Sequence, residues 1–161
     1  MYTPEALLDL HERCHRSFEK LLLHCAAFDP GVLNRELAGF GYPTIRLKVH
    51  HVIGAEDYWL GVVRGNFSVD ENDAAYPTIP SLETWRLQVA ADTQAWLRGA
   101  NAQDLNTARP MKTWGGKEHV IRPAHVLLRT QTHIFQHQGQ VAAMCRLLGK
   151  PIPAGLDFPL G

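Results

Sequence analysis

Two histidines four residues apart, His133 and His137, have the spacing in this chain that most directly suggests chemistry. On a helix, residues four apart lie one turn from each other on the same face, so this pair presents two imidazoles to one point. Side chains with this spacing can bind one metal ion. Val141 and Met144 fall on the same side of the helix, so the pair points into the core. Core packing without a metal is the alternative, although burying imidazoles without strong partners costs about 1–3 kcal/mol each.

A third ligand is expected on another helix, because a catalytic metal centre commonly uses three protein ligands and leaves a position to water or substrate. Two adjacent histidines, His50 and His51, lie in the amphipathic stretch 45–64. On a helical wheel, His50 falls on the polar side and His51 falls at the edge of the apolar face. His51 is therefore the better candidate.

Two polar residues, Glu56 and Gln140, are candidate catalytic groups near these histidines. Glu56 lies near the centre of an apolar helix face, where a carboxylate is rarely buried without a partner. It either orients a ligand histidine or carries a proton, or it makes a structural hydrogen bond to a core Trp or Tyr, which is the favoured interpretation. Gln140 either supports a ligand in the same way or packs as an ordinary polar residue.

A second histidine pair with the same spacing, His11 and His15, is the main rival site. Glu12 stands before His15 with the Glu-x-x-His spacing of di-iron bundles, but such a site requires a second motif and two further glutamates. The sequence contains this motif once. We therefore expect His11 or His15 to border the metal pocket rather than to form a second metal site.

Four amphipathic segments must position these residues, and the sequence predicts that they are helices. Thr3 and Thr44 act as N-caps for the first two, Ser81 opens the third, and Pro123 starts the last. The expected helices cover residues 4–28, 45–64, 81–99 and 123–148, with a polar crossover at 67–80, a small hairpin at 109–122 and an irregular tail to 161. This pattern predicts an all-α protein, a four-helix bundle with a hairpin or irregular segment before the last helix.

The composition limits the classes of protein to which the chain can belong. Its 161 residues suffice for one core, so a single domain over residues 1–161 is expected. Lys plus Arg and Asp plus Glu number 16 each, which disfavours nucleic-acid binding because no broad positive field remains. Three cysteines are too few for a disulfide framework and favour a cytoplasmic protein. No apolar run reaches the roughly 18 residues that span a bilayer, so no membrane association is expected.

The run His51–Trp59, together with the run Thr132–Gln140, resembles the DinB/YfiT-like metalloenzyme superfamily. The resemblance covers nearly the whole chain and implies a four-helix bundle in up-down-down-up order. It also implies that His51, His133 and His137 bind one divalent metal ion.

One departure from the family is Gln136, where many members have a further histidine. Members include bacillithiol transferases and mycothiol-dependent isomerases, in which the metal is thought to activate a low-molecular-weight thiol. The resemblance thus implies a metal-dependent thiol transferase or hydrolase that acts on a small molecule, with Zn, Ni or Fe as the metal. Three neutral imidazoles leave such an ion its double positive charge, which makes a water or thiol nucleophilic near neutral pH.

Other interpretations stay open at this point. The chain could be a non-catalytic, stress-related bundle that binds metal for structure or protein interaction. A homodimer is expected because apolar residues outnumber what four short helices hide. Tail residues such as Asp157 or Phe158 are candidates to line the pocket. A metalloprotease is excluded, because Ile134 stands where a His-Glu-x-x-His motif needs glutamate.

Overall fold

The computed structural model describes residues 1–69 and 71–161, so Asp70 of the predicted crossover lies outside the described residues. Four long helices dominate the fold: α1 (Pro4–Ala26), α3 (Ile45–Arg64), α4 (Ile79–Gly99) and α6 (Pro123–Leu147). The shorter elements are α2 (Pro30–Leu33), α5 (Ala102–Asn106), the 3₁₀ turns η1 (Asp73–Ala75) and η2 (Trp114–Gly116), and the strands β1 (Arg109–Lys112) and β2 (Glu118–Ile121). The described chain is mostly helical, which is consistent with the predicted all-α class.

The helix starts follow from local capping chemistry. The Thr3 hydroxyl accepts a hydrogen bond from the backbone N–H of Ala6 at 3.2 Å, and Thr44 caps α3 in the same way, as predicted. The predicted start of the third long helix was wrong by about one turn. Thr78 is the N-cap of α4, and Ser81 is its third helical residue, whose hydroxyl accepts from the Thr78 N–H at 3.1 Å. The two residues form a capping box, which identifies Thr78 rather than Ser81 as the residue that begins the helix.

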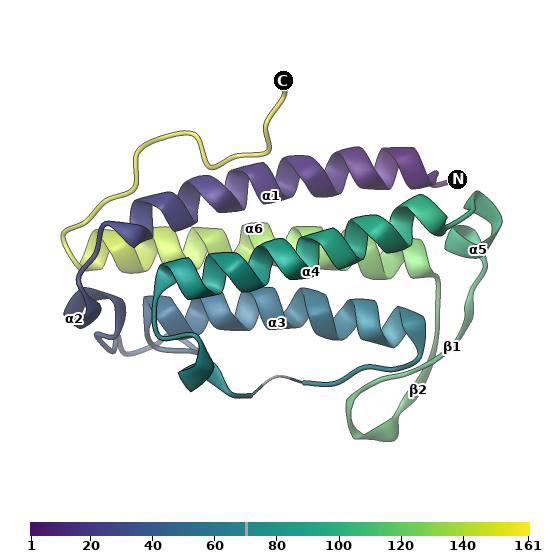
Figure 1. The fold of residues 1–161 in the computed structure, drawn as a ribbon, viewed down its shortest axis with the longest axis horizontal. Coiled ribbons are helices and arrows are strands. Elements are labelled where there is room, and N and C mark those ends of the chain that lie inside the picture. Colours follow the sequence, from purple (N-terminus) through teal and green to yellow (C-terminus); the bar gives the residue numbers. More distant parts are fainter. Residues whose placement is uncertain (70) are drawn as a thin grey trace.

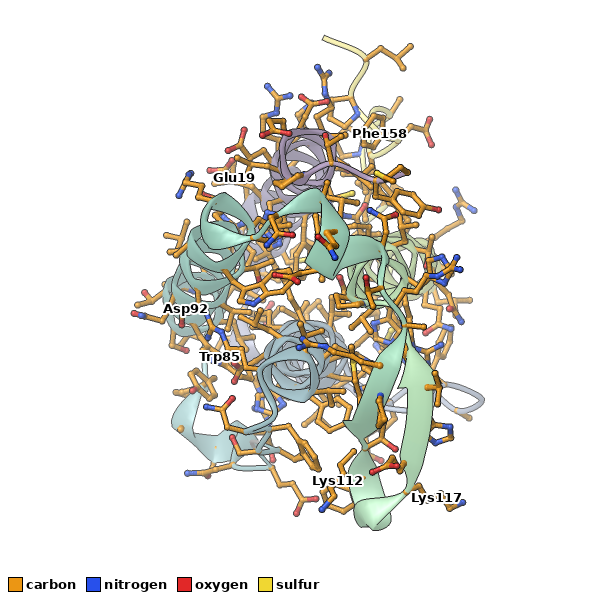
Figure 2. All side chains as sticks on the ribbon, turned by 90° about the vertical axis from the view of Figure 1, so that its right-hand side faces the viewer. Glu19, Trp85, Asp92, Lys112, Lys117 and Phe158 are labelled. Atoms are coloured by element: carbon orange, nitrogen blue, oxygen red, sulfur yellow. The ribbon has the colours of Figure 1, made fainter. Side chains whose placement is uncertain are left out.

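The four long helices pack side by side, with α1 and α3 each lying against both α4 and α6 (Figure 1). The crossover between α3 and α4 returns along the length of the molecule, so both helices begin at the end where α1 and α6 finish (Figure 1). Figure 2 views the helices end-on and shows side chains filling the space between them. Phe18, Ile53, Leu82 and Met144, one from each long helix, are among the buried residues of this core.

A two-stranded antiparallel hairpin precedes α6, as the sequence predicts, with Arg109 opposite Ile121. Its turn contains Gly115 and Gly116 at φ 71° and 73°, a backbone conformation that glycine adopts without steric cost. The backbone N–H of Trp114 donates to the Tyr58 hydroxyl at 2.7 Å, which attaches the turn to α3. The hairpin extends beyond α3 and α6 (Figure 2).

The C-terminal tail has no helix or strand and runs back past α1 (Figure 1). The Ser17 hydroxyl donates to the Leu156 carbonyl at 2.6 Å, and Arg13 donates to the Pro159 carbonyl at 3.0 Å. Among the residues that the structure describes, no helix combines the length and the apolar character needed to cross a membrane.

Candidate metal centre

The packing of α3 against α6 brings His51, His133 and His137 together. One ring nitrogen from each lies within 4.8 Å of the other two. The Nε2 atoms of His133 and His137 are 3.0 Å apart. The ring centre of His51 lies 5.1 Å from that of His133 and 4.9 Å from that of His137. The structure therefore assembles the three histidines that the sequence proposes as ligands. We call this group the three-histidine centre.

The donor set and its spacing fit a divalent cation. Two imidazole nitrogens that bind one ion at about 2.0–2.1 Å, with a right-angled to tetrahedral geometry, lie roughly 2.8–3.4 Å apart. The 3.0 Å between the Nε2 atoms of His133 and His137 falls in this range. The same distance also suits a hydrogen bond between the two rings, and in that case the donor ring would have to carry its proton on Nδ1 before both Nε2 atoms could bind a metal. Three imidazoles suit several transition metals and do not select one.

Gln140 fixes which nitrogen of His137 carries a proton. Its side-chain oxygen lies 2.8 Å from Nδ1 of His137, and an amide oxygen can only accept a hydrogen bond. Nδ1 is therefore the donor, and in the neutral ring Nε2 keeps its lone pair for a metal. Of the two interpretations given for Gln140, its contact with a ligand histidine supports the orienting one. Gln136, one turn earlier, is exposed to solvent.

The environment keeps the three imidazoles neutral. Burial, and then the proximity of His133 and His137, lowers the pKa of His51 to about 4. Burial, followed by the charges of His137 and Arg129, lowers the pKa of His133 to about 4. Burial also lowers the pKa of His137. All three rings are thus unprotonated at neutral pH, the state in which imidazole binds metals.

Lys48 is a buried cation beside the centre. Only 2% of its surface is exposed, and its Nζ donates to the Gly41 carbonyl. Its charge contributes to lowering the pKa of each of the three histidines, while burial lowers its own pKa. Lys48 stands three positions before His51, so helical spacing alone is enough to predict that the two are neighbours.

Tyr42 covers one face of the His51 ring. The two rings are stacked, with centres 4.0 Å apart and planes 18° from parallel. Tyr42 is the one non-glycine residue of the described chain at positive φ, 61°, a conformation that costs an ordinary side chain roughly 1–2 kcal/mol. The loop between α2 and α3 thus places an aromatic ring against the candidate metal ligand His51, which no pattern in the sequence indicates.

A cavity of about 880 Å³ opens beside the three-histidine centre. His51 and His133 form part of its wall, and aromatic side chains that include Tyr58, Trp59 and Trp114 line it. This volume suits a small-molecule ligand. The helices α3 and α6 and the hairpin contribute these residues, and Asp157 and Phe158, proposed as lining residues, are absent from the wall that the structure describes. Phe158 lies on the side of the molecule away from Lys112 and Lys117 of the hairpin (Figure 2).

Glu56 belongs to a different group, which we call the His–His–Glu cluster. Its carboxylate accepts hydrogen bonds from His11 at 2.7 Å, from His15 at 2.8 Å and from the Thr93 hydroxyl at 2.9 Å. The partner expected on structural grounds was a Trp or Tyr, and the functional alternative was a ligand histidine. The expected Trp or Tyr partner was wrong, and these three partners of Glu56 are not among the proposed metal ligands, because α1 and α4 supply the groups that face this position of α3.

The His–His–Glu cluster has its protons committed to hydrogen bonds. Arg86 lies 2.9 Å from Nδ1 of His15 and can only donate, so the opposite nitrogen of His15 carries the proton that Glu56 accepts. Burial lowers the pKa of His15. Burial opposes ionisation of Glu56, but His15 and His11 together hold its pKa well below its usual value.

The expected role of His11 or His15 at the border of the metal pocket was wrong for the described residues. Neither residue lines the 880 Å³ cavity. His11 is fully buried, and His15 lies at a separate cavity of about 360 Å³ with Arg86 in its wall. Spacing alone placed the pair correctly on a buried helix face but did not reveal that Glu56 would face it.

Comparison with known protein families gives one match. The sequence model of the DinB family matches residues 1–160, which confirms the resemblance carried by the histidine motifs. No curated protein matches the chain significantly.

Proposed function

Because the chain belongs to the DinB family, we propose that it is a metal-dependent enzyme that acts on a small molecule. His51, His133 and His137 hold one divalent cation, and the substrate occupies the adjacent cavity. The observation that carries this proposal is the convergence of three neutral imidazoles, two of which, His51 and His133, line a cavity of about 880 Å³. The proposed reaction is thiol transfer or related nucleophilic chemistry, and the up-down-down-up helix order implied by the family forms part of the proposal.

A bound divalent ion would supply Lewis-acid chemistry that makes a thiol or water nucleophilic at neutral pH. The chain's own residues prepare the site for it. Gln140 holds the Nδ1 proton of His137 and so directs the Nε2 lone pair to the centre. Tyr42 holds the ring of His51 by stacking. Lys48 is near enough for its charge to lower the pKa of all three histidines, and in its protonated form it favours an anionic reactant there.

The proposed setting is a reduced cytoplasm, and the proposed assembly is a homodimer. All three cysteines are free and buried, which supports the first. Leu23, Leu87 and Leu147 are each more than half exposed, and burying such side chains would favour association.

Metal content and turnover test the proposed function. Purified protein is loaded with Zn²⁺, Ni²⁺ or Fe²⁺, its bound metal is counted, and it is incubated with an electrophile and bacillithiol, mycothiol or glutathione. We expect one equivalent of metal and turnover with at least one thiol. In His133→Ala we expect loss of turnover and at least a roughly 10²-fold weaker metal affinity, because one of the three proposed metal-binding histidines is removed. The matched control is His119→Ala, because His119 lines the same cavity outside the three-histidine centre and its loss should leave the metal content unchanged.

Two results would contradict the proposal at different levels. A protein that binds no stoichiometric metal would refute the metal centre itself. A protein that binds one equivalent of metal but turns over none of the thiols would support the non-catalytic bundle instead.

A further inference from the structure

Arg129 lies in the wall of the same cavity as the metal centre, one helical turn before His133. Its guanidinium carbon is 5.1 Å from the ring centre of Trp59 on α3, in a cation–π contact. Side chains one turn apart on a helix are about 5–6 Å from each other at their bases. A small ligand in this cavity can therefore reach both Arg129 and the three-histidine centre.

The hydrogen-bonding groups of Arg129 are available to such a ligand. Within the described chain, the structure shows the stacking on Trp59 and no hydrogen bond or ion pair made by the guanidinium. A guanidinium carries five N–H donors in a planar fork that matches the two oxygens of a carboxylate. Stacking on Trp59 restricts the plane of this fork, so less side-chain freedom is lost when an anion binds.

The acidic residues of the cavity lie away from this position. Asp73 and Glu71 come from the crossover, and the Asp73 carboxylate accepts from Arg46 at 2.7 Å. Arg46 stands in the first turn of α3, 13 positions before Trp59, which corresponds to about 20 Å along the helix. The end of the cavity at Arg129 therefore favours a negative charge, and the end at Asp73 does not.

We propose that Arg129 is the anchor for a carboxylate on the ligand, and that the enzyme takes small carboxylate-bearing molecules whose reactive group lies a few atoms from that carboxylate. This inference rests on the proposed metal site, because the reactive end of the ligand lies at His51 and His133. Arg129 is a specificity-determining residue under this proposal, and its exposed side chain belongs to the cavity wall that Tyr58 and Trp59 also form.

A matched pair of thiols tests the proposal. The protein is loaded with Co²⁺, and 3-mercaptopropionate or its neutral isostere 3-mercaptopropionamide is titrated in while the thiolate-to-cobalt absorption is recorded. The two probes differ only in the charged group that Arg129 would bind. We expect wild type to bind the carboxylate about 10-fold or more tighter than the amide, as for charge-assisted hydrogen bonds.

Substitution of Arg129 should remove this preference. In Arg129→Met the affinity ratio should fall to about one, while the neutral amide still binds and the cobalt spectrum is unchanged. Arg146→Met, an exposed arginine in the last turn of the same helix, is the control and should keep the wild-type ratio. A ratio that stays the same in Arg129→Met would overturn the inference and leave the metal site intact.

Two further readouts separate the remaining outcomes. If no cobalt spectrum develops at all, the metal site is refuted, and the inference falls with it. Inorganic phosphate is the competing anion, and we expect an equal concentration to leave 3-mercaptopropionate bound. Displacement by phosphate would assign the subsite to phosphate rather than carboxylate and overturn the stated substrate class.

Discussion

The molecule contains two histidine pairs with identical spacing, and their surroundings differ. On α6, His133 and His137 face each other with 3.0 Å between their Nε2 atoms. On α1, His11 and His15 both face the carboxylate of Glu56, at 2.7 Å and 2.8 Å. The difference lies in the group that the neighbouring helix supplies. His51 of α3 joins one pair to form a group that could hold a metal ion, whereas Glu56 of α3 accepts hydrogen bonds from the other pair.

Access to the two sites differs in the same sense. The three-histidine centre opens to a cavity large enough for a small molecule, while all three members of the His–His–Glu cluster are buried. Glu56 also accepts from Thr93, so its hydrogen-bonding capacity is used by protein groups. Equal spacing therefore identifies histidine pairs that could bind a metal. Whether a pair has a catalytic or a structural role depends on the residue that the neighbouring helix supplies and on whether a small molecule can reach it.

The largest effect should come from removing the carboxylate of the buried cluster. Glu56→Leu leaves the N–H groups of His11 and His15 and the hydroxyl of Thr93 without an acceptor, so the free energy of unfolding should fall by roughly 3–5 kcal/mol. Urea unfolding measures this loss. Thr93→Val, which removes one hydrogen bond to Glu56, is the smaller control and should cost about 1 kcal/mol.

The metal content of the Glu56 variant decides whether the comparison is correct. We expect folded Glu56→Leu to bind as much metal as wild type, since the cluster holds protons. Loss of a full equivalent of metal with unchanged stability would show that the His–His–Glu cluster is itself a metal site.

A smaller effect is expected when the support of a ligand is removed from the three-histidine centre. Gln140→Leu no longer accepts from Nδ1 of His137, so either ring nitrogen can carry the proton and the ring is less well oriented. Metal affinity should fall by roughly 10- to 100-fold, with little change in the stability of the metal-free protein. Competition with a coloured chelator measures the affinity. Gln136→Leu, an exposed position one turn earlier, is the control; equal losses in the two variants would argue against the orienting role.

The stability of the metal-free protein should also depend on pH. His51 and His133 have a pKa of about 4 in the folded protein, below the value of about 6.5 in an unfolded chain. Above pH 6.5 both states are neutral and stability is independent of these groups. Between pH 6.5 and 4 the unfolded chain binds more protons, so stability falls as the pH falls.

Unfolding at several pH values with a chelator present tests this dependence. His133→Gln should show a shallower decline over the same window, because one of the histidines with a lowered pKa is gone. The carboxylate of Glu56 contributes only at lower pH, since its pKa is held well below the usual range. A decline of the same slope in His133→Gln would show that other groups cause it.

Helix positions and the three candidate ligands could be predicted from the sequence because their causes are local. Thr3 and Thr44 cap helices through bonds to residues three positions on, and the period of a helix places His133 and His137 on one face. The partners of Glu56 could not be predicted in this way. A helical wheel shows that Glu56 points inward, but the identity of the facing helices depends on how the whole bundle packs.

The residues that surround the cavity likewise include some that local spacing could predict and some that it could not. Lys48 could have been found, since it stands three positions before His51 on the same helix. Tyr42 and Trp114 could not, because they come from a loop and a hairpin turn whose positions depend on contacts with distant segments, such as the bond from Trp114 to Tyr58. Arg129 lies within the helix expected over 123–148, yet its contact with Trp59 joins two helices and has no local signal.

The backbone conformation of Tyr42 favours glycine for thermal stability, whereas the structure of the site uses the tyrosine ring. At 61° the backbone of this residue prefers glycine, so selection for heat resistance alone would favour Tyr42→Gly. The same replacement would remove the ring that covers His51. A screen of variants for a higher melting temperature would therefore select Tyr42→Gly, whereas a screen for bound metal would retain Tyr42.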